Sequence, residues 1–118
     1  MFRNQPNFLN LDNYRKDRIK ESLAARDLIV AMSENFRALS DPTRLQILLA
    51  LENSELCVYD LASLIGLPQP TVSYHLKALR QSGIIKFRRS GKMTLYSLRD
   101  TRISGLLAVA RDYSRNHQ

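Results

Sequence analysis

At 118 residues the chain is long enough for one folded domain with a modest core and too short for two independent ones. Its residues are 44% apolar and 25% charged, which excludes wholesale disorder, and no apolar run reaches the roughly 18 residues of a membrane span. The N-terminal residues have no apolar stretch of the signal-peptide type, so we expect a cytoplasmic protein that does not contact a membrane.

The positive charge lies in the C-terminal half of the chain. The formal net charge is +7, but residues 1–68 carry 8 Lys and Arg against 9 Asp and Glu, whereas residues 69–118 carry 10 against 2. A basic surface can attract nucleic acid, anionic lipid or acidic proteins. Because the excess positive charge is confined to one half of the chain, a generally charged, solvated surface does not explain it well, and a binding partner for this half is the more specific explanation.

The first part of the chain is predicted to be an arm followed by helices. Residues 1–12 are rich in Asn and predict a flexible arm, and residues 13–116 predict a single domain. Apolar residues spaced by three and four predict helix from Arg15 to about Leu39, with a break possible near Ala24. A further helix begins with Ser40 or Asp41 as N-cap and Pro42 in its first turn, and it ends near Asn53.

The segment Asp60–Leu79 has the spacing of a helix-turn-helix. Ala62 allows close contact between two short helices, Gly66 four residues later suits a turn of positive φ, and Val72 anchors the second helix. The sequence "GLPQP" is predicted to separate the helices, and Gly83 to cap the second one.

Two β-prone runs and a final helix follow. Ile84–Arg89 and Met93–Leu98 predict a hairpin whose turn is Ser90-Gly91-Lys92, and Ile103, Leu106, Leu107 and Ala110 form one face of a last helix. The fold class is therefore mainly α with a small β-hairpin, an α+β winged helix-turn-helix. In such a domain the second helix of the motif enters the major groove of DNA and the hairpin follows the backbone.

The expected DNA contacts lie on that helix and on the hairpin. With Val72, Leu76 and Leu79 facing the core, we expect the outward side chains to read bases and nearby backbone, and Lys77 to bind phosphate. At the hairpin, Arg88 and Arg89 point to opposite faces of the strand, so one is expected to enter the minor groove and the other to meet phosphate or solvent. The predicted DNA-binding residues are Gln69, Thr71, Ser73, Tyr74, His75, Lys77, Arg88, Arg89 and Lys92.

Four blocks in this order resemble the ArsR/SmtB family of winged-helix repressors over roughly residues 27–112. They are "FRALSDPTRLQILLAL" (Phe36–Leu51), "ELCVYDLA" (Glu55–Ala62), "QPTVSYHLKALRQSGII" (Gln69–Ile85) and "RRSGKMTLYSL" (Arg88–Leu98). The resemblance implies a homodimer, joined through the first and last helices, that represses transcription from a palindromic double-stranded operator until an inducer arrives. The apolar stripes at both ends of the chain also favour a helix–helix dimer, because a small domain cannot bury them alone.

The metal sites of that family are not intact in this sequence. The resemblance places a thiol pair in "ELCVYDLA", where this chain has Cys57 but Tyr59 at the second position. On the last helix Asp100 matches the first ligand, but Arg102 stands where a His is common. A lone carboxylate beside an arginine is a poor zinc site, so we expect no metal and no cofactor, and the inducer stays unknown.

Three other interpretations follow from single residues or from the fold. Cys57 is a possible redox sensor, although the apolar triplet "LCV" favours a small buried side chain. A thiol-dependent enzyme would need Cys57 near His75, and between Pro68 and Arg99 no Cys, Asp or Glu accompanies that histidine, so we expect no enzyme. A winged helix kept for dimerisation or protein contact remains the third alternative.

Overall fold

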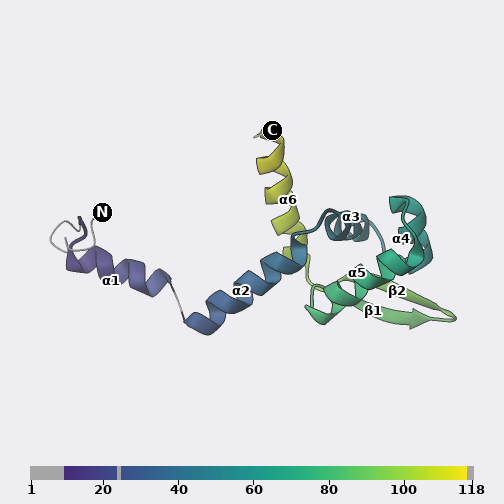
Figure 1. Cartoon of the computed structure of the whole chain (residues 1–118), viewed down its shortest axis with the longest axis horizontal. Helices are drawn as coiled ribbons and strands as arrows, with labels where there is room; N and C mark the ends of the chain where they lie inside the picture. Colours follow the sequence, from purple (N-terminus) through teal and green to yellow (C-terminus); the bar gives the residue numbers. More distant parts are fainter. Residues whose placement is uncertain (1–9, 24, 117–118) are drawn as a thin grey trace. The chain divides into compact units, whose positions relative to one another are not determined.

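The computed structural model describes residues 10–23 and 25–116, and within these ranges it contains six helices and one two-stranded sheet (Figure 1). The chain divides into two units, residues 1–33 and 34–118, each of which is described by itself. Of the predicted flexible arm, residues 1–9 lie outside the described residues.

The first unit contains helix α1 (Asn13–Ser22) and the beginning of α2 (Arg26–Leu39). Asp12 caps α1, because its side chain accepts a hydrogen bond from the Arg15 N–H at 2.7 Å. The predicted break is confirmed, since α1 ends at Ser22 and α2 begins at Arg26, although Ala24 itself lies outside the described residues. No residue of α1 is buried.

Helix α3 (Pro42–Leu51) follows the end of α2 in the second unit. Asp41 is its N-cap, with Oδ2 accepting from the Arg44 N–H at 3.0 Å, and Pro42 occupies the first turn, where no N–H is needed. Asp41 rather than Ser40 is thus the cap. The helix ends at Leu51 rather than near Asn53.

Helices α4 (Val58–Ile65) and α5 (Gln69–Gln81) form the predicted helix-turn-helix. Gly66 has φ +79° and its N–H donates to the Ala62 carbonyl at 2.8 Å, while Val72 is fully buried. The roles predicted for Ala62, Gly66 and Val72 are confirmed. The turn is shorter than "GLPQP", because Gln69 and Pro70 already belong to α5, whose first turn tolerates a proline.

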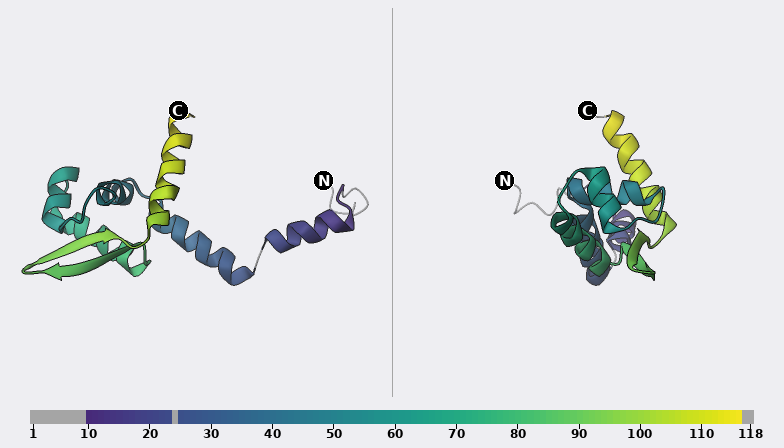
Figure 2. Two further views of the ribbon diagram at one scale, coloured as in Figure 1. Left: turned by 180° about the vertical axis from the view of Figure 1, so that it is seen from behind. Right: turned by 90° about the vertical axis from the view of Figure 1, so that its right-hand side faces the viewer.

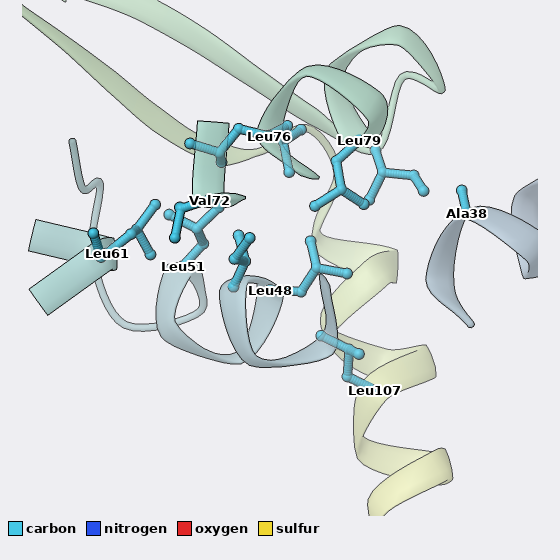
Figure 3. Close-up of a cluster of buried hydrophobic side chains, with 12 residues drawn as sticks. Ala38, Leu48, Leu51, Leu61, Val72, Leu76, Leu79 and Leu107 are labelled. Atoms are coloured by element: carbon cyan, nitrogen blue, oxygen red, sulfur yellow. The ribbon is translucent and has the colours of Figure 1, made fainter. Parts of the chain in front are cut away.

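The core of the second unit lies where α3, α4 and α5 pack together. Figure 3 shows side chains from all three helices meeting, with Leu107 of the last helix and Ala38 of α2 at one side. The side chains that are fully buried are those of Ile47, Leu48, Leu61, Val72, Leu76, Leu79 and Ile85. Because Val72, Leu76 and Leu79 anchor one face of α5, the opposite face of this helix is fixed toward solvent.

Strands β1 (Ile85–Ser90) and β2 (Met93–Leu98) form the hairpin. Ser90 pairs with Met93, so the turn consists of Gly91 and Lys92, with Gly91 at φ +62°. The bounds predicted for β1 were therefore wrong by one residue at each end, and the predicted turn was one residue too long. A bridge between Leu56 and Tyr96, which the sequence did not predict, adds the segment before α4 to the sheet. Figures 1 and 2 show the hairpin running from its root near the last helix to a turn at the far end of this unit.

The last helix, α6 (Thr101–Asn116), buries one residue, Leu107. Leu106 and Val109 are 42% and 67% exposed. No helix of the described residues is both long and apolar enough to cross a membrane.

Candidate nucleic-acid interface

The solvent-facing side of α5 carries five of the predicted contacts. Gln69, Thr71, Ser73, Tyr74 and Lys77 are all exposed, and Tyr74 is 66% exposed. Within the part of the chain that the structure describes, no hydrogen bond or ion pair occupies the side chains of Gln69, Thr71, Ser73 or Lys77. Their donors and acceptors therefore remain available to a ligand that lies along the helix.

His75 does not face outward as predicted. Its side chain is only 13% exposed, and its Nδ1 accepts a hydrogen bond from Arg44 Nε at 3.1 Å, with Asp41 Oδ2 at 3.9 Å. The physical reason is its position on the helix. At 100° per residue, His75 lies on the flank of α5 that meets the start of α3, whereas Tyr74 lies on the outward line.

The hairpin presents its two arginines in different ways. Arg88 forms a bidentate pair with Glu55, with Nε and Nη2 each 2.8 Å from a carboxylate oxygen. This bond to Arg88 lowers the pKa of the Glu55 carboxyl, and the bond to Glu55 raises the pKa of Arg88. Arg89 and Lys92 are exposed and have no such partner among the described residues.

Arg80 links α5 to the hairpin. Its guanidinium lies over the Phe87 ring, 4.9 Å from the ring centroid, a contact that holds a cation between the two elements. We call the exposed cations of α5 and of both sides of the hairpin, taken together, the basic face: Lys77, Arg80, Lys86, Arg88, Arg89 and Lys92. Among the described residues, Glu55 is the one carboxylate that contacts the basic face.

Glu55 is the residue of this region that the sequence did not predict. It lies in the connection between α3 and α4 and meets Arg88 across 33 positions of sequence. No local periodicity relates residues at that distance. The position of Glu55 immediately before the Leu56–Tyr96 bridge explains the contact, because this bridge aligns the connection with the sheet.

Cys57 is a buried residue at the start of α4. It is 4% exposed, and its Sγ donates to Asp60 Oδ2 at 3.5 Å. His75 makes its contacts with Arg44, Asp41 and Tyr74, so the structure does not bring Cys57 and His75 together as a reactive pair.

Asp100, which the family resemblance matched to a metal ligand, is engaged by Arg102. The Arg102 Nη2 donates to Asp100 Oδ2 at 2.6 Å, and the Arg102 backbone N–H donates to Oδ1 at 2.8 Å. These bonds lower the pKa of Asp100 to about 2, and the side-chain bond has the larger effect. Across residues 10–23 and 25–116, no cluster of three or more His, Cys, Asp or Glu could hold a metal ion.

An exposed, acid-free recognition helix followed by a basic hairpin defines a winged helix-turn-helix DNA-binding protein. Comparison with known proteins agrees with this class and also identifies the family. The family of bacterial regulatory proteins named arsR matches residues 41–86.

A transcriptional repressor SmtB homolog from Synechocystis is 36% identical over 95 residues, which cover 80% of this chain and 72% of that protein. A CadC homolog from Staphylococcus aureus, a cadmium resistance regulator, is 41% identical over 96 residues, covering 80% and 78%. The chain therefore belongs to the ArsR/SmtB family, whose members are DNA-binding transcriptional regulators and not enzymes.

A solved structure supports the fold independently. The homodimeric winged helix-turn-helix domain of Mb0332 from Mycobacterium bovis, a possible ArsR-family regulator, superposes with a TM-score of 0.72 at 28% identity. The superposition covers 77% of this chain and 84% of that one. The predicted fold class is confirmed.

Proposed function

We propose that the chain is a homodimeric repressor that binds a palindromic operator through α5 and the hairpin. The observation that carries this proposal is the basic face, whose Lys77, Arg89 and Lys92 have no protein partner among the described residues. Free cations beside a helix of free polar side chains are what a phosphate-lined groove requires.

The side chains divide by the chemistry they offer. Gln69 can bind base edges, Thr71 and Ser73 can contact bases or phosphates, and Tyr74 can pack on the groove wall. Lys77, Arg89 and Lys92 bind phosphates or the minor groove. Arg88 is held by Glu55, so Arg89 is the arginine that enters the minor groove, and Arg88 sets the position of the hairpin.

Exposed apolar side chains support the dimer. In the second unit these include Phe36 at the end of α2 (56% exposed) and Leu106 and Val109 of α6. In the first unit Leu28 and Met32 of α2 are 53% and 46% exposed. A dimer joined through the first and last helices, as the family resemblance implies, needs such apolar side chains, and the M. bovis domain is itself a homodimer.

The inducer of this repressor is not a metal bound at the usual family sites. Arg102 neutralises Asp100 and occupies both of its oxygens, and Cys57 has Tyr59 where a second thiol would be needed. Burial of Cys57 against Asp60 favours a packing role over redox sensing.

Selection of bound duplexes from a random pool tests this function. We expect enrichment of an inverted repeat whose half-sites lie about one helical turn apart, because two copies of α5 must enter successive major grooves. Retention of DNA without any enriched sequence, or no retention, would instead favour a protein-interaction module.

A further inference from the structure

A polar junction connects the recognition helix to the end of α2 and the start of α3. Arg44 is at its centre: Nε donates to His75 Nδ1 at 3.1 Å, Nη1 donates to the Ala38 carbonyl at 3.3 Å, and the backbone N–H donates to Asp41 Oδ2 at 3.0 Å. One arginine thus joins the end of α2, the cap of α3 and the middle of α5. All of these residues belong to the second unit.

The Arg44 bond determines which nitrogen of His75 carries the hydrogen. A guanidinium is always protonated and only donates, so the Nδ1 that it contacts must keep its lone pair. In the neutral imidazole the hydrogen then lies on Nε2. Arg44 therefore holds His75 in the Nε2–H tautomer.

The Nε2–H group is accessible to solvent although the ring is mostly covered. Among the described residues no buried side-chain nitrogen or oxygen lacks a hydrogen-bond partner. In that part of the chain the hydrogen bond and the ion pair of His75 both involve Nδ1 and none involves Nε2, while its ring packs in a T-shaped arrangement with that of the neighbouring Tyr74, with the two centroids 5.2 Å apart. Nε2 must therefore reach the surface, on the flank of α5 beside the start of α3.

We propose that Arg44 is a positioning residue that fixes His75 as an Nε2–H donor to a DNA phosphate at the edge of the groove that α5 enters. This inference rests on the proposed function. A phosphate is the matching partner because it only accepts hydrogen bonds, and because the flank of a recognition helix faces the wall of the groove rather than its floor. His75 thus contributes to DNA binding without facing the bases.

Two variants of His75 separate its two nitrogens. His75→Asn keeps an acceptor near the position of Nδ1 but lacks a group at Nε2, whereas His75→Gln carries an amide donor near Nε2 but no acceptor at Nδ1. With the full-length protein and its selected duplex, we expect His75→Asn to weaken binding about tenfold, the usual effect of one lost hydrogen bond to a charged group. His75→Gln should recover part of this loss.

The salt dependence distinguishes this contact from that of a cation. A neutral N–H displaces no counterion, so the slope of log K against log salt should be the same for His75→Asn and the unaltered protein. Thermal unfolding of both variants, compared with the unaltered protein, identifies any loss that comes from misfolding.

The tautomer itself can be measured without DNA. Long-range ¹H–¹⁵N spectra of the free protein should show His75 Nδ1 as the unprotonated nitrogen and Nε2 as the protonated one, and Arg44→Ala should convert this signal into a mixture. An Nδ1–H signal in the unaltered protein would overturn the role of Arg44.

The DNA experiment separates the remaining outcomes. If the unaltered protein binds its duplex and His75→Asn binds equally well, the phosphate contact is wrong while the proposed function stands. If the unaltered protein binds no DNA at all, the proposed function is wrong and the phosphate contact is wrong with it.

Discussion

Arg88 and Arg89 are neighbours in β1 whose surroundings give them different tasks. The Glu55 carboxylate holds Arg88 through two hydrogen bonds of 2.8 Å, while the side chain of Arg89 has no hydrogen bond or ion pair among the described residues. A cation that is already paired with a carboxylate gains less binding free energy from contact with a phosphate. Charge on the hairpin is thus divided between one arginine that fixes it to the domain and one that remains free for DNA.

This division predicts unequal effects of the two arginines on DNA affinity. Arg89→Ala should weaken binding to every duplex about tenfold and reduce the salt slope by about one for each subunit, because a phosphate contact is lost. Arg88→Ala is the matched control and should weaken DNA binding less than Arg89→Ala does. Glu55→Gln should strengthen binding to any duplex because it frees Arg88. Fluorescence anisotropy at several salt concentrations measures all three, and equal losses for the two arginines would contradict the division.

The Asp100–Arg102 pair predicts a pH dependence. The pKa of Asp100 is lowered from 3.8 to about 2 by its hydrogen bonds to Arg102. Because the folded-state pKa lies below the unfolded one, the contribution of this carboxylate to stability is complete above about pH 4 and is lost as the pH falls through about 2. Carboxyl NMR titration should place the Asp100 midpoint near pH 2, and Arg102→Ala should move it toward 3.8. Arg99→Ala, the matched control, should leave it unchanged.

At the scale of elements, the helix-turn-helix depends on one backbone conformation. Gly66 has φ +79°, and a Cβ built there would meet no atom within 4 Å. A side chain at this position therefore costs backbone strain but causes no clash. The turn sets the angle at which α5 leaves α4, so it also sets which face of α5 meets the core.

We predict that Gly66→Ala lowers the free energy of unfolding by about 1 kcal/mol, the cost of placing an L-residue in the left-handed region. Gly66→Asn should lower the free energy of unfolding by less than Gly66→Ala, because Asn tolerates this conformation. Chemical denaturation measures both. An alanine variant as stable as the unaltered protein would show that the turn does not require glycine.

The elements that could be predicted from the sequence are those encoded by local patterns. The stripe of Val72, Leu76 and Leu79 and the glycine turn both follow from spacing over a few residues, and the hairpin follows from β-prone runs around Gly91. The contacts Arg44–His75 and Arg88–Glu55 could not be predicted, because their partners lie 31 and 33 residues apart and meet only after the helices pack. For that reason Glu55 was missed, whereas the outward position predicted for His75 was wrong because, at 100° per residue, this residue lies on the flank of α5.

At the scale of the whole molecule, the proposed DNA contacts and the proposed dimer contacts lie on different elements. The basic face lies on α5 and the hairpin, whereas the exposed apolar residues Leu106 and Val109 lie on α6, which buries Leu107 in the core and packs Ile103 against it. A second subunit is therefore expected to cover α6 without blocking α5. Such an arrangement presents two recognition helices to one duplex.

Val109→Glu tests the dimer. Placing a carboxylate at an apolar contact should raise the dimer dissociation constant at least about tenfold, since charge buried without a partner is costly. Ala108→Glu, one residue earlier and about 100° around the helix, is the matched control and should leave the dimer intact. Analytical ultracentrifugation measures both. Equal behaviour of the two variants would place the interface elsewhere.

The central claim is that the basic face binds DNA, and a titration of the unaltered protein against its selected duplex and a scrambled duplex tests it most directly. With three free cations in each subunit, we predict selective binding whose log K falls linearly with log salt at a slope of roughly −5. Equal affinity for both duplexes, or an affinity that does not change with salt, would contradict the claim.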